Sequence, residues 1–233
     1  MKKHYPWLWF DADGTLFDYN SAEAVALQNT FHELQLPFED GYLDAYREIN
    51  QRLWQALEKR EITPSALGLR RFELLLQALQ LQASYAEMSS IYVQQLANCA
   101  ELMDGAQAVL EALHKHSRIA IVTNGLQAVQ RSRLAHSVIK EWISDIIISE
   151  EIGKAKPDAA FFEIAAARLV ARFGLFPKSD ILIIGDSLTS DMQGGINYGI
   201  DTCWYNPGLE PKADGLSITY EIRRLTELLE LLE

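Results

Sequence analysis

From about residue 104 onward, the chain alternates short apolar runs with longer amphipathic segments. Such runs are too short for helices and fit buried strands. They are residues 7–10 near the start, then 119–122, 146–148, 181–184 and 202–205. Strands that alternate with helices form a parallel sheet that is covered on both faces. The sequence therefore predicts an α/β fold with a Rossmann-like parallel sheet core.

The stretch between the first apolar run and residue 100 has a different pattern, in which apolar side chains recur at helical spacing. Because this stretch separates the first expected strand from the others, we predict an inserted, all-helical domain of residues 18–100. The α/β core domain would then consist of residues 1–17 and 101–233. An insertion at this place would lie over the carboxyl edge of the sheet and could act as a lid.

Local signals also predict where several helices begin. Asn20 can cap the first helix, with Glu23 placed for the reciprocal hydrogen bond. Pro157 is expected to open a long alanine-rich helix, since proline suits the first helical turn. The tail from about Glu221 is predicted to be a helix.

The first apolar run is followed at once by Asp11-Ala12-Asp13-Gly14-Thr15, which places two carboxylates two residues apart. Asp-Gly after a strand is an ordinary turn signal, so this segment alone supports a turn and a catalytic site equally. A calcium loop is excluded because Leu16 and Ala22 stand where that loop needs Gly and Glu. Two carboxylates this close repel each other, which is costly unless a cation or a reaction uses them.

Two later apolar runs also end in polar side chains. Thr123 and Asn124 follow one run, and Asp186 and Asp191 follow another. If the strands are neighbours and parallel, all these side chains meet Asp11 and Asp13 at one edge of the sheet. Lys156, at the expected start of a helix, can supply a cation there.

Each of these residues also has a structural interpretation. Thr123 alone fits the end of a strand, and Asn124-Gly125 is a common turn pair. Lys156 fits a solvated lysine, and an aspartate such as Asp186 fits a helix cap. Their joint occurrence in this order, each at the end of a strand or the start of a helix, is much harder to explain by structural roles.

The set of side chains suits phosphoryl transfer. A carboxylate can attack phosphorus, and a second carboxyl group can give a proton to the leaving oxygen. A hydroxyl, an amide, backbone N–H groups and an ammonium can hold the phosphoryl oxygens. Mg²⁺, bound by one or two carboxylates with water and phosphate, would offset the repulsion between the anions.

With these motifs in this order, the chain resembles the haloacid dehalogenase-like hydrolase superfamily over its whole length. The four motifs are Asp11 to Thr15, Thr123-Asn124-Gly125, Lys156-Pro157 and Gly185 to Asp191. The helical insertion matches a cap of the first type in that superfamily. The resemblance implies a magnesium-dependent phosphatase that hydrolyses phosphomonoesters of small metabolites through an aspartyl phosphate.

The resemblance also implies the catalytic roles. Asp11 would be the nucleophile, and Asp13 the general acid and then the base that activates water. Thr123 and Lys156 would hold the phosphoryl group. The amides of Asn124 and Gly125 would assist in binding the substrate.

The same resemblance implies the metal site. Asp11, Asp186 and the main-chain carbonyl of Asp13 would bind Mg²⁺. Asp191 would be an acidic neighbour that orients these ligands.

Three further segments are similar to bacterial pyrimidine 5′-nucleotidases of this superfamily. They are Asn50 to Trp54, Arg71-Phe72 and Thr202 to Asn206. The similarity implies nucleoside 5′-monophosphates as substrates, with Trp54, Arg71 and Phe72 among the positions that would contact the leaving group. Trp54 equally fits a helix core, which is the commoner place for tryptophan, and Arg71 fits an exposed arginine.

Other functions of the same fold remain open at this point. A phosphomutase shares all four motifs, and a sugar-phosphate phosphatase would differ only in the insertion. A haloacid dehalogenase needs neither Asp13 nor the acidic fourth motif, and a non-catalytic phosphate-binding protein would be expected to lack Asp11 or Asp13. These two are therefore less favoured.

Composition limits the partners. The net charge of −11 argues against nucleic-acid polymers and anionic membranes. The chain has two cysteines, Cys99 and Cys203, whose wide separation fits buried free thiols in a reducing compartment. It contains neither an apolar stretch long enough to span a membrane nor the pattern of a signal peptide. We expect a cytoplasmic protein, a monomer or small homo-oligomer, whose partner is a small phosphorylated metabolite.

Overall fold

The computed structural model describes residues 3–59, 61–212 and 215–232. The chain divides into two compact units. One unit is Asn20–Cys99, and the other is formed by the segments up to Tyr19 and from Ala100 onward. The first is called the helical unit below, and the second the α/β unit.

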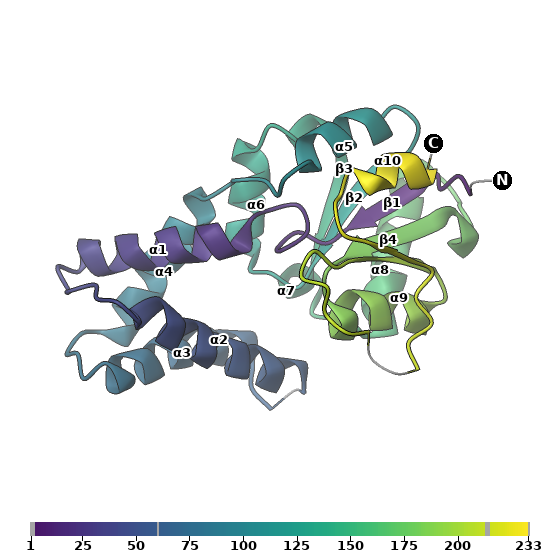
Figure 1. Cartoon of the computed structure of the whole chain (residues 1–233). Helices are drawn as coiled ribbons and strands as arrows, with labels where there is room; N and C mark the ends of the chain where they lie inside the picture. Colours follow the sequence, from purple (N-terminus) through teal and green to yellow (C-terminus); the bar gives the residue numbers. More distant parts are fainter. Residues whose placement is uncertain (1–2, 60, 213–214, 233) are drawn as a thin grey trace. The chain divides into compact units, whose positions relative to one another are not determined.

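The α/β unit is built on a six-stranded sheet, in which every pair of neighbouring strands is parallel (Figure 1). The strands are β1 (Trp7–Phe10), β2 (Arg118–Thr123), β3 (Ile143–Ile148), β4 (Ile181–Gly185), β5 (Asp201–Tyr205) and β6 (Tyr220–Ile222). Their order is β3-β2-β1-β4-β5-β6. The direction of strand succession reverses between β1 and β4, where open α/β sheets bind their ligands. The predicted α/β class with a Rossmann-like core is confirmed.

Helices cover both faces of this sheet. Side chains of β1 alternate, so Leu8 and Phe10 pack on one face while Trp7 and Trp9 pack on the other. The first face is covered by α5 (Ala106–Leu113), α6 (Gln127–His136) and α10 (Glu227–Leu232). The second is covered by α8 (Ala159–Phe173) and α9 (Gln193–Tyr198). Figure 1 shows α5 and α10 on one side of the strands, and α8 and α9 on the other.

Four short elements complete the α/β unit. They are η1 (Lys140–Trp142), α7 (Ser149–Ile152), η2 (Lys178–Asp180) and the π-helical turn η3 (Leu188–Met192). The turn η3 follows β4 after Asp186 and Ser187, and it carries Asp191. It therefore returns an acidic side chain to the end of the strand that it follows.

Two predicted helix starts in this unit are wrong. The tail at Glu221 is not helical, because β6 pairs with β5 through Cys203 and Tyr220, and α10 begins only at Glu227. The long helix α8 begins at Ala159 rather than at Pro157. The Asp158 carboxylate accepts from the Ala160 amide at 3.0 Å, so Asp158 is the cap.

In the helical unit, every regular element that the structure describes is a helix. The helices are α1 (Tyr19–Glu33), α2 (Tyr42–Glu58), α3 (Pro64–Ala78) and α4 (Tyr85–Asn98). The rings of Tyr46, Phe72 and Tyr92, from α2, α3 and α4, pack together with centroids 5.2 to 5.7 Å apart. All three are fully buried, so they form the centre of this unit's core.

A polar network, buried at Glu23, Asn50 and Arg71 and half-exposed at Arg47, links α1, α2 and α3. The Glu23 carboxylate accepts from Arg47 Nε at 2.8 Å and from Asn50 Nδ2 at 3.4 Å. Arg71 donates to Asn50 Oδ1 at 3.5 Å. The predicted capping box is therefore wrong, because Asn20 lies within α1 and Glu23 binds tertiary partners instead. These four residues, Glu23, Arg47, Asn50 and Arg71, are called the Glu23 network below.

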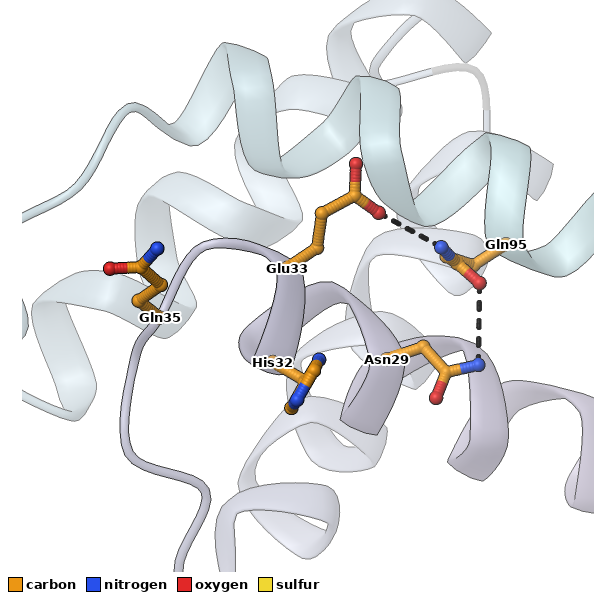
Figure 2. A pocket seen from close by; sticks show the side chains of 5 residues that line it. All are labelled: Asn29, His32, Glu33, Gln35 and Gln95. Carbon is orange, nitrogen blue, oxygen red and sulfur yellow. Dashed lines mark hydrogen bonds between the residues drawn. The ribbon is translucent and has the colours of Figure 1, made fainter.

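The helical unit also has an open hollow of about 630 Å³ on its surface, lined by polar residues of α1, α4 and the α1–α2 connection. Gln95 lies between Glu33 and Asn29, with hydrogen bonds of 2.9 and 3.3 Å (Figure 2). These bonds join α1 to α4, so they have a structural role. None of the residues that line the hollow belongs to the four sequence motifs. In the described part of the chain, no helix is both long and apolar enough to cross a membrane.

Candidate active site

The site lies at the carboxyl ends of β1 and β4, where the strand order reverses. The Asp11 amide donates to the Ile184 carbonyl at 2.9 Å, which extends the pairing of the two strands by one residue. Asp11 and Asp186 therefore leave the sheet side by side. This is the arrangement that parallel strands at a switch point predict for residues that follow each strand.

Asp11, Asp186 and Asp191 form a carboxylate cluster. Each of these side chains offers one oxygen, and the three oxygens lie within 4.8 Å of one another. Asp191 is fully buried, Asp11 is 9% exposed, and Asp186 is the most exposed of the three. Carboxylate oxygens at this separation are the donors that Mg²⁺ prefers, so the residues present fit a hard divalent cation.

Lys156 lies inside this cluster. Its Nζ is 2.6 Å from Asp11 Oδ1, 2.6 Å from Asp191 Oδ1 and 2.7 Å from the Val122 carbonyl. Burial alone would lower the pKa of Lys156, but the carboxylates of Asp11 and Asp191 outweigh it and raise this pKa. Lys156 is therefore a permanent cation that holds the Asp11 carboxylate in place.

One ammonium does not balance three carboxylates. Loss of hydration, then the charges of Asp11 and Asp191, raise the pKa of Asp186 to about 8. Loss of hydration and Asp11 also raise the pKa of Asp191 to about 7, although Lys156 acts against this rise. When all three carboxyl groups are ionised, the cluster carries an excess of negative charge, which a bound cation would neutralise.

Three neighbours fix Asp186. Thr15 Oγ1 donates to Asp186 Oδ1 at 3.1 Å, and Trp204 Nε1 donates to the Asp186 carbonyl at 2.9 Å. Gly14 has a φ of 80°, and a Cβ at this position would lie 2.7 Å from Asp186 Oδ2. Only glycine therefore meets both the turn and the space that the site requires. The roles of Thr15 and Trp204 were not predicted, because they depend on contacts between distant segments.

The second motif is tied to the third. Asn124 Oδ1 accepts from the Lys156 amide at 2.9 Å, and Asn124 Nδ2 donates to the Lys156 carbonyl at 2.9 Å. Thr123 is buried, and its Oγ1 accepts from the Gly125 amide at 3.0 Å. The Asn124 side chain thus sets the position of Lys156. In the bond to Gly125 the Thr123 hydroxyl is the acceptor, so this bond leaves its hydrogen available for donation.

The Asp13 carboxylate faces α6. One of its oxygens is paired with Arg133 Nη1, and the other accepts from Gln130 Nε2 at 2.6 Å. Burial raises the pKa of Asp13, and the charge of Arg133 opposes this rise. Neither Gln130 nor Arg133 was predicted as a site residue. The available signal was their three-residue spacing on the helix after Thr123-Asn124-Gly125, which puts both on one helix face.

The family comparison agrees with this geometry. The family model described as haloacid dehalogenase-like hydrolase matches residues 7–199. The chain belongs to the haloacid dehalogenase-like hydrolase family. The predicted family membership is confirmed, and the protein is an enzyme of the hydrolase class.

Two bacterial relatives match nearly the whole chain. The pyrimidine 5′-nucleotidase PynA of Streptococcus pneumoniae is 35% identical, and the match covers 98% of this chain and 95% of PynA. The pyrimidine 5′-nucleotidase YjjG of Escherichia coli is 31% identical, with 98% of each chain covered. These two matches confirm the resemblance to the bacterial nucleotidase branch.

A solved structure of another relative matches the fold closely. The HAD-hydrolase YfnB of Bacillus subtilis, in a crystal form bound to magnesium, superimposes with a TM-score of 0.93 at 36% identity. The match covers 99% of this chain and 100% of YfnB. The fold of the family is thus present in full in this chain.

Proposed function

We propose that this hydrolase is a magnesium-dependent phosphatase that cleaves phosphomonoesters of small metabolites through an aspartyl phosphate on Asp11. The observation that carries the proposal is the excess charge of the carboxylate cluster, in which three carboxylates surround one lysine. A second acidic side chain, Asp13, lies two residues from the proposed nucleophile. A divalent cation would neutralise this excess and so allow a dianionic phosphate ester to bind beside the carboxylates.

In the first half of the reaction, a carboxylate oxygen of Asp11 attacks phosphorus and the bond from phosphorus to the ester oxygen breaks. The leaving alkoxide takes the proton of the Asp13 carboxyl group. In the second half, a water molecule gives a proton to Asp13 and attacks the same phosphorus. The bond between phosphorus and Asp11 breaks, which releases inorganic phosphate and restores both aspartates.

Thr123 and Lys156 hold the phosphoryl oxygens during both halves. Lys156 supplies a fixed positive charge, which stabilises charge that moves onto these oxygens. Thr123 supplies a hydroxyl donor, and the amides of Asn124 and Gly125 assist, the Gly125 amide by exchanging its bond to Thr123 Oγ1 for a phosphoryl oxygen. The two hydrogen bonds from the Asn124 side chain to the Lys156 backbone support this assignment, because they fix the lysine before substrate binds.

Asp11, Asp186 and the main-chain carbonyl of Asp13 would hold the magnesium ion. When bound, the ion would neutralise the phosphoryl oxygens and offset the repulsion among the carboxylates. Asp191 orients this set, since its two oxygens bind Lys156 Nζ at 2.6 Å and the Ser187 amide at 3.1 Å. The magnesium in the YfnB crystal structure supports this choice of metal.

Nucleoside 5′-monophosphates are the proposed substrates. The support is that PynA and YjjG, which match nearly the whole of this chain, are pyrimidine 5′-nucleotidases. We propose that residues 18–100 form a cap that contacts the leaving group. Within that cap, the half-buried Trp54 is the candidate contact. Phe72 is fully buried in the helical core and Arg71 is 2% exposed within the Glu23 network, so neither presents a free surface to a nucleoside.

The enzyme is further proposed to act in the cytoplasm as a monomer or small homo-oligomer. The chain's net charge of −11 argues against binding to nucleic-acid polymers and anionic membranes. Small phosphorylated metabolites, rather than nucleic-acid polymers, are then its partners.

A phosphate-release screen tests the proposed function. The magnesium-loaded enzyme is offered pyrimidine and purine nucleoside 5′-monophosphates, sugar phosphates and 2-chloropropionate. We expect release of phosphate from several nucleotides and no release of chloride. Preference for sugar phosphates with no nucleotide hydrolysed would overturn the substrate class alone. Chloride release, or inactivity toward every ester, would overturn the phosphatase assignment.

A further inference from the structure

Helix α6 brings two side chains to the Asp13 carboxylate. Gln130 and Arg133 lie three residues apart on this helix and are 1% and 0% exposed. Gln130 Nε2 binds one carboxylate oxygen at 2.6 Å, and Arg133 Nη1 pairs with the other. With both oxygens held from the same helix, the plane of the Asp13 carboxyl group has little freedom to rotate.

The surroundings of α6 are shaped for these two contacts. A Cβ on Gly125 would lie 2.2 Å from Gln130 Nε2, so the absence of a side chain there leaves the space that Gln130 occupies. The guanidinium of Arg133 lies 5.9 Å from the centre of the Phe17 ring, which belongs to the same turn as Asp13. Both side chains therefore have a defined orientation before any substrate binds.

We propose that Gln130 and Arg133 are positioning residues that hold the Asp13 carboxyl group in line with the ester oxygen and the attacking water. The inference rests on the proposed function, because it concerns the proton transfers of that reaction. A displacement of the catalytic carboxyl group by about 1 Å slows the reaction by about 10²-fold, even though the group is still present. The alternative is that Arg133 only compensates a buried charge and contributes to folding.

The two possibilities predict different responses to the leaving group. An alkoxide leaves slowly unless it is protonated, whereas 4-nitrophenolate leaves without a proton. A displaced Asp13 therefore slows the attack on alkyl phosphates and the hydrolysis of the aspartyl phosphate. It leaves the formation of the aspartyl phosphate from 4-nitrophenyl phosphate nearly unchanged. A purely structural loss reduces all of these steps together.

The test uses Gln130→Met and Arg133→Met in the full-length, magnesium-loaded enzyme. Gln127→Met and Arg131→Met are matched controls on the same helix. Gln127 is exposed, and Arg131 forms a surface ion pair with Glu151 at 2.7 Å. Steady-state turnover is measured with a nucleoside 5′-monophosphate, and nitrophenol release is followed before the steady state. Melting temperatures show which variants are folded.

We expect Gln130→Met to lose about 10²-fold in kcat with the nucleotide, with little change in KM. With 4-nitrophenyl phosphate it should show a burst of about one nitrophenol per enzyme, followed by slow turnover. The control variants should resemble the wild type. Arg133→Met should behave like Gln130→Met, and if it does not fold, Gln130→Met decides the question alone.

Two results would overturn the inference. One is a Gln130→Met enzyme as active as Gln127→Met with the nucleotide. The other is an equal loss with both substrates and no burst. In either case an active wild type leaves the proposed function intact, whereas a wild type that hydrolyses neither ester overturns the proposed function and the inference together.

Discussion

The two units of the molecule each bury charged side chains, but the charges are combined differently. In the α/β unit, the carboxylates of Asp11, Asp186 and Asp191 surround the single ammonium of Lys156. In the helical unit, the Glu23 network combines one carboxylate with one amide and two guanidinium groups. The carboxylate cluster has more negative than positive charges, whereas the Glu23 network has one negative and two positive charges.

This difference in charge indicates which of the two clusters is catalytic. A protein gains no stability from crowding carboxylates, and the pKa values of Asp186 and Asp191 are raised by loss of hydration first and by the neighbouring carboxylates next. The Glu23 network instead joins three helices, and its Arg71 also lies over the Tyr92 ring at 4.7 Å. We therefore assign the carboxylate cluster to catalysis and the Glu23 network to the stability of the helical unit.

The largest expected effect comes from Asp11→Asn. The amide is nearly the same size but is a poor nucleophile, so kcat should fall by at least about 10⁴-fold. The melting temperature should change little, and Asp40→Asn, at an exposed position of the helical unit, is the matched control. Wild-type turnover in Asp11→Asn would show that the nucleophile is misassigned.

Replacement of Asp13 by Asn should have the next largest effect. Loss of the proton donor and base should lower kcat by about 10² to 10⁴-fold while KM changes little. Steady-state kinetics with a nucleoside 5′-monophosphate measures the change. A variant that keeps wild-type kcat would remove Asp13 from the mechanism and leave its contacts with α6 structural.

Removal of magnesium tests whether the carboxylate cluster, rather than the Glu23 network, binds the ion. Chelation should lower activity by at least about 10²-fold, and readdition should restore it. At a concentration 100 times its dissociation constant, Mg²⁺ should stabilise the fold by about 2.7 kcal/mol. Thermal unfolding measures this shift, which should shrink in Asp186→Asn and persist in Arg71→Met. A shift of equal size in Asp186→Asn would place the ion elsewhere.

Arg71→Met tests the structural side of the comparison. Loss of the guanidinium leaves Asn50 Oδ1 without this buried donor, which should cost about 1 to 3 kcal/mol of unfolding free energy. Denaturant unfolding measures the cost, and Arg70→Met, whose ion pair with Glu73 is on the surface, is the control. If Arg71→Met keeps full stability but changes the ranking of substrates, the Glu23 network belongs to substrate recognition instead.

Trp54→Ala should produce the smallest effect. If the half-buried indole stacks on the leaving group, its loss removes about 1 to 3 kcal/mol from the binding of nucleotides. The ratio of kcat/KM for a nucleotide to that for 4-nitrophenyl phosphate should fall accordingly. An equal fall for both substrates, together with a lower melting temperature, would assign Trp54 to the core.

The parts of the site that follow from strand geometry could be predicted from the sequence. Residues directly after β1 and β4 must meet, so Asp11, Asp186 and the nearby Asp191 were expected together. The partners of Asp13 could not be predicted in this way, because the directions of Gln130 and Arg133 depend on how α6 packs. Lys156 was predicted as a cation at this edge. Its hydrogen bonds with the Asn124 side chain could not be predicted, because they depend on a contact between two loops.

Two of the errors in the fold have the same cause. The capping box at Asn20 failed because Arg47 and Asn50 reach Glu23 from another helix. The segment at Glu221 became a strand because β5 offers an edge with which it pairs. In both places a tertiary partner overrides the local preference that the sequence shows.

The covalent intermediate is the central claim, and chemical trapping tests it most directly. The enzyme is mixed with magnesium and a nucleoside 5′-monophosphate, quenched during turnover and reduced with borohydride, which converts an aspartyl phosphate to homoserine. Peptide mass spectrometry then locates the modified residue. The account predicts homoserine at position 11, dependent on substrate and absent from Asp11→Asn. Homoserine at another aspartate, or turnover with no trapped residue at all, would contradict it.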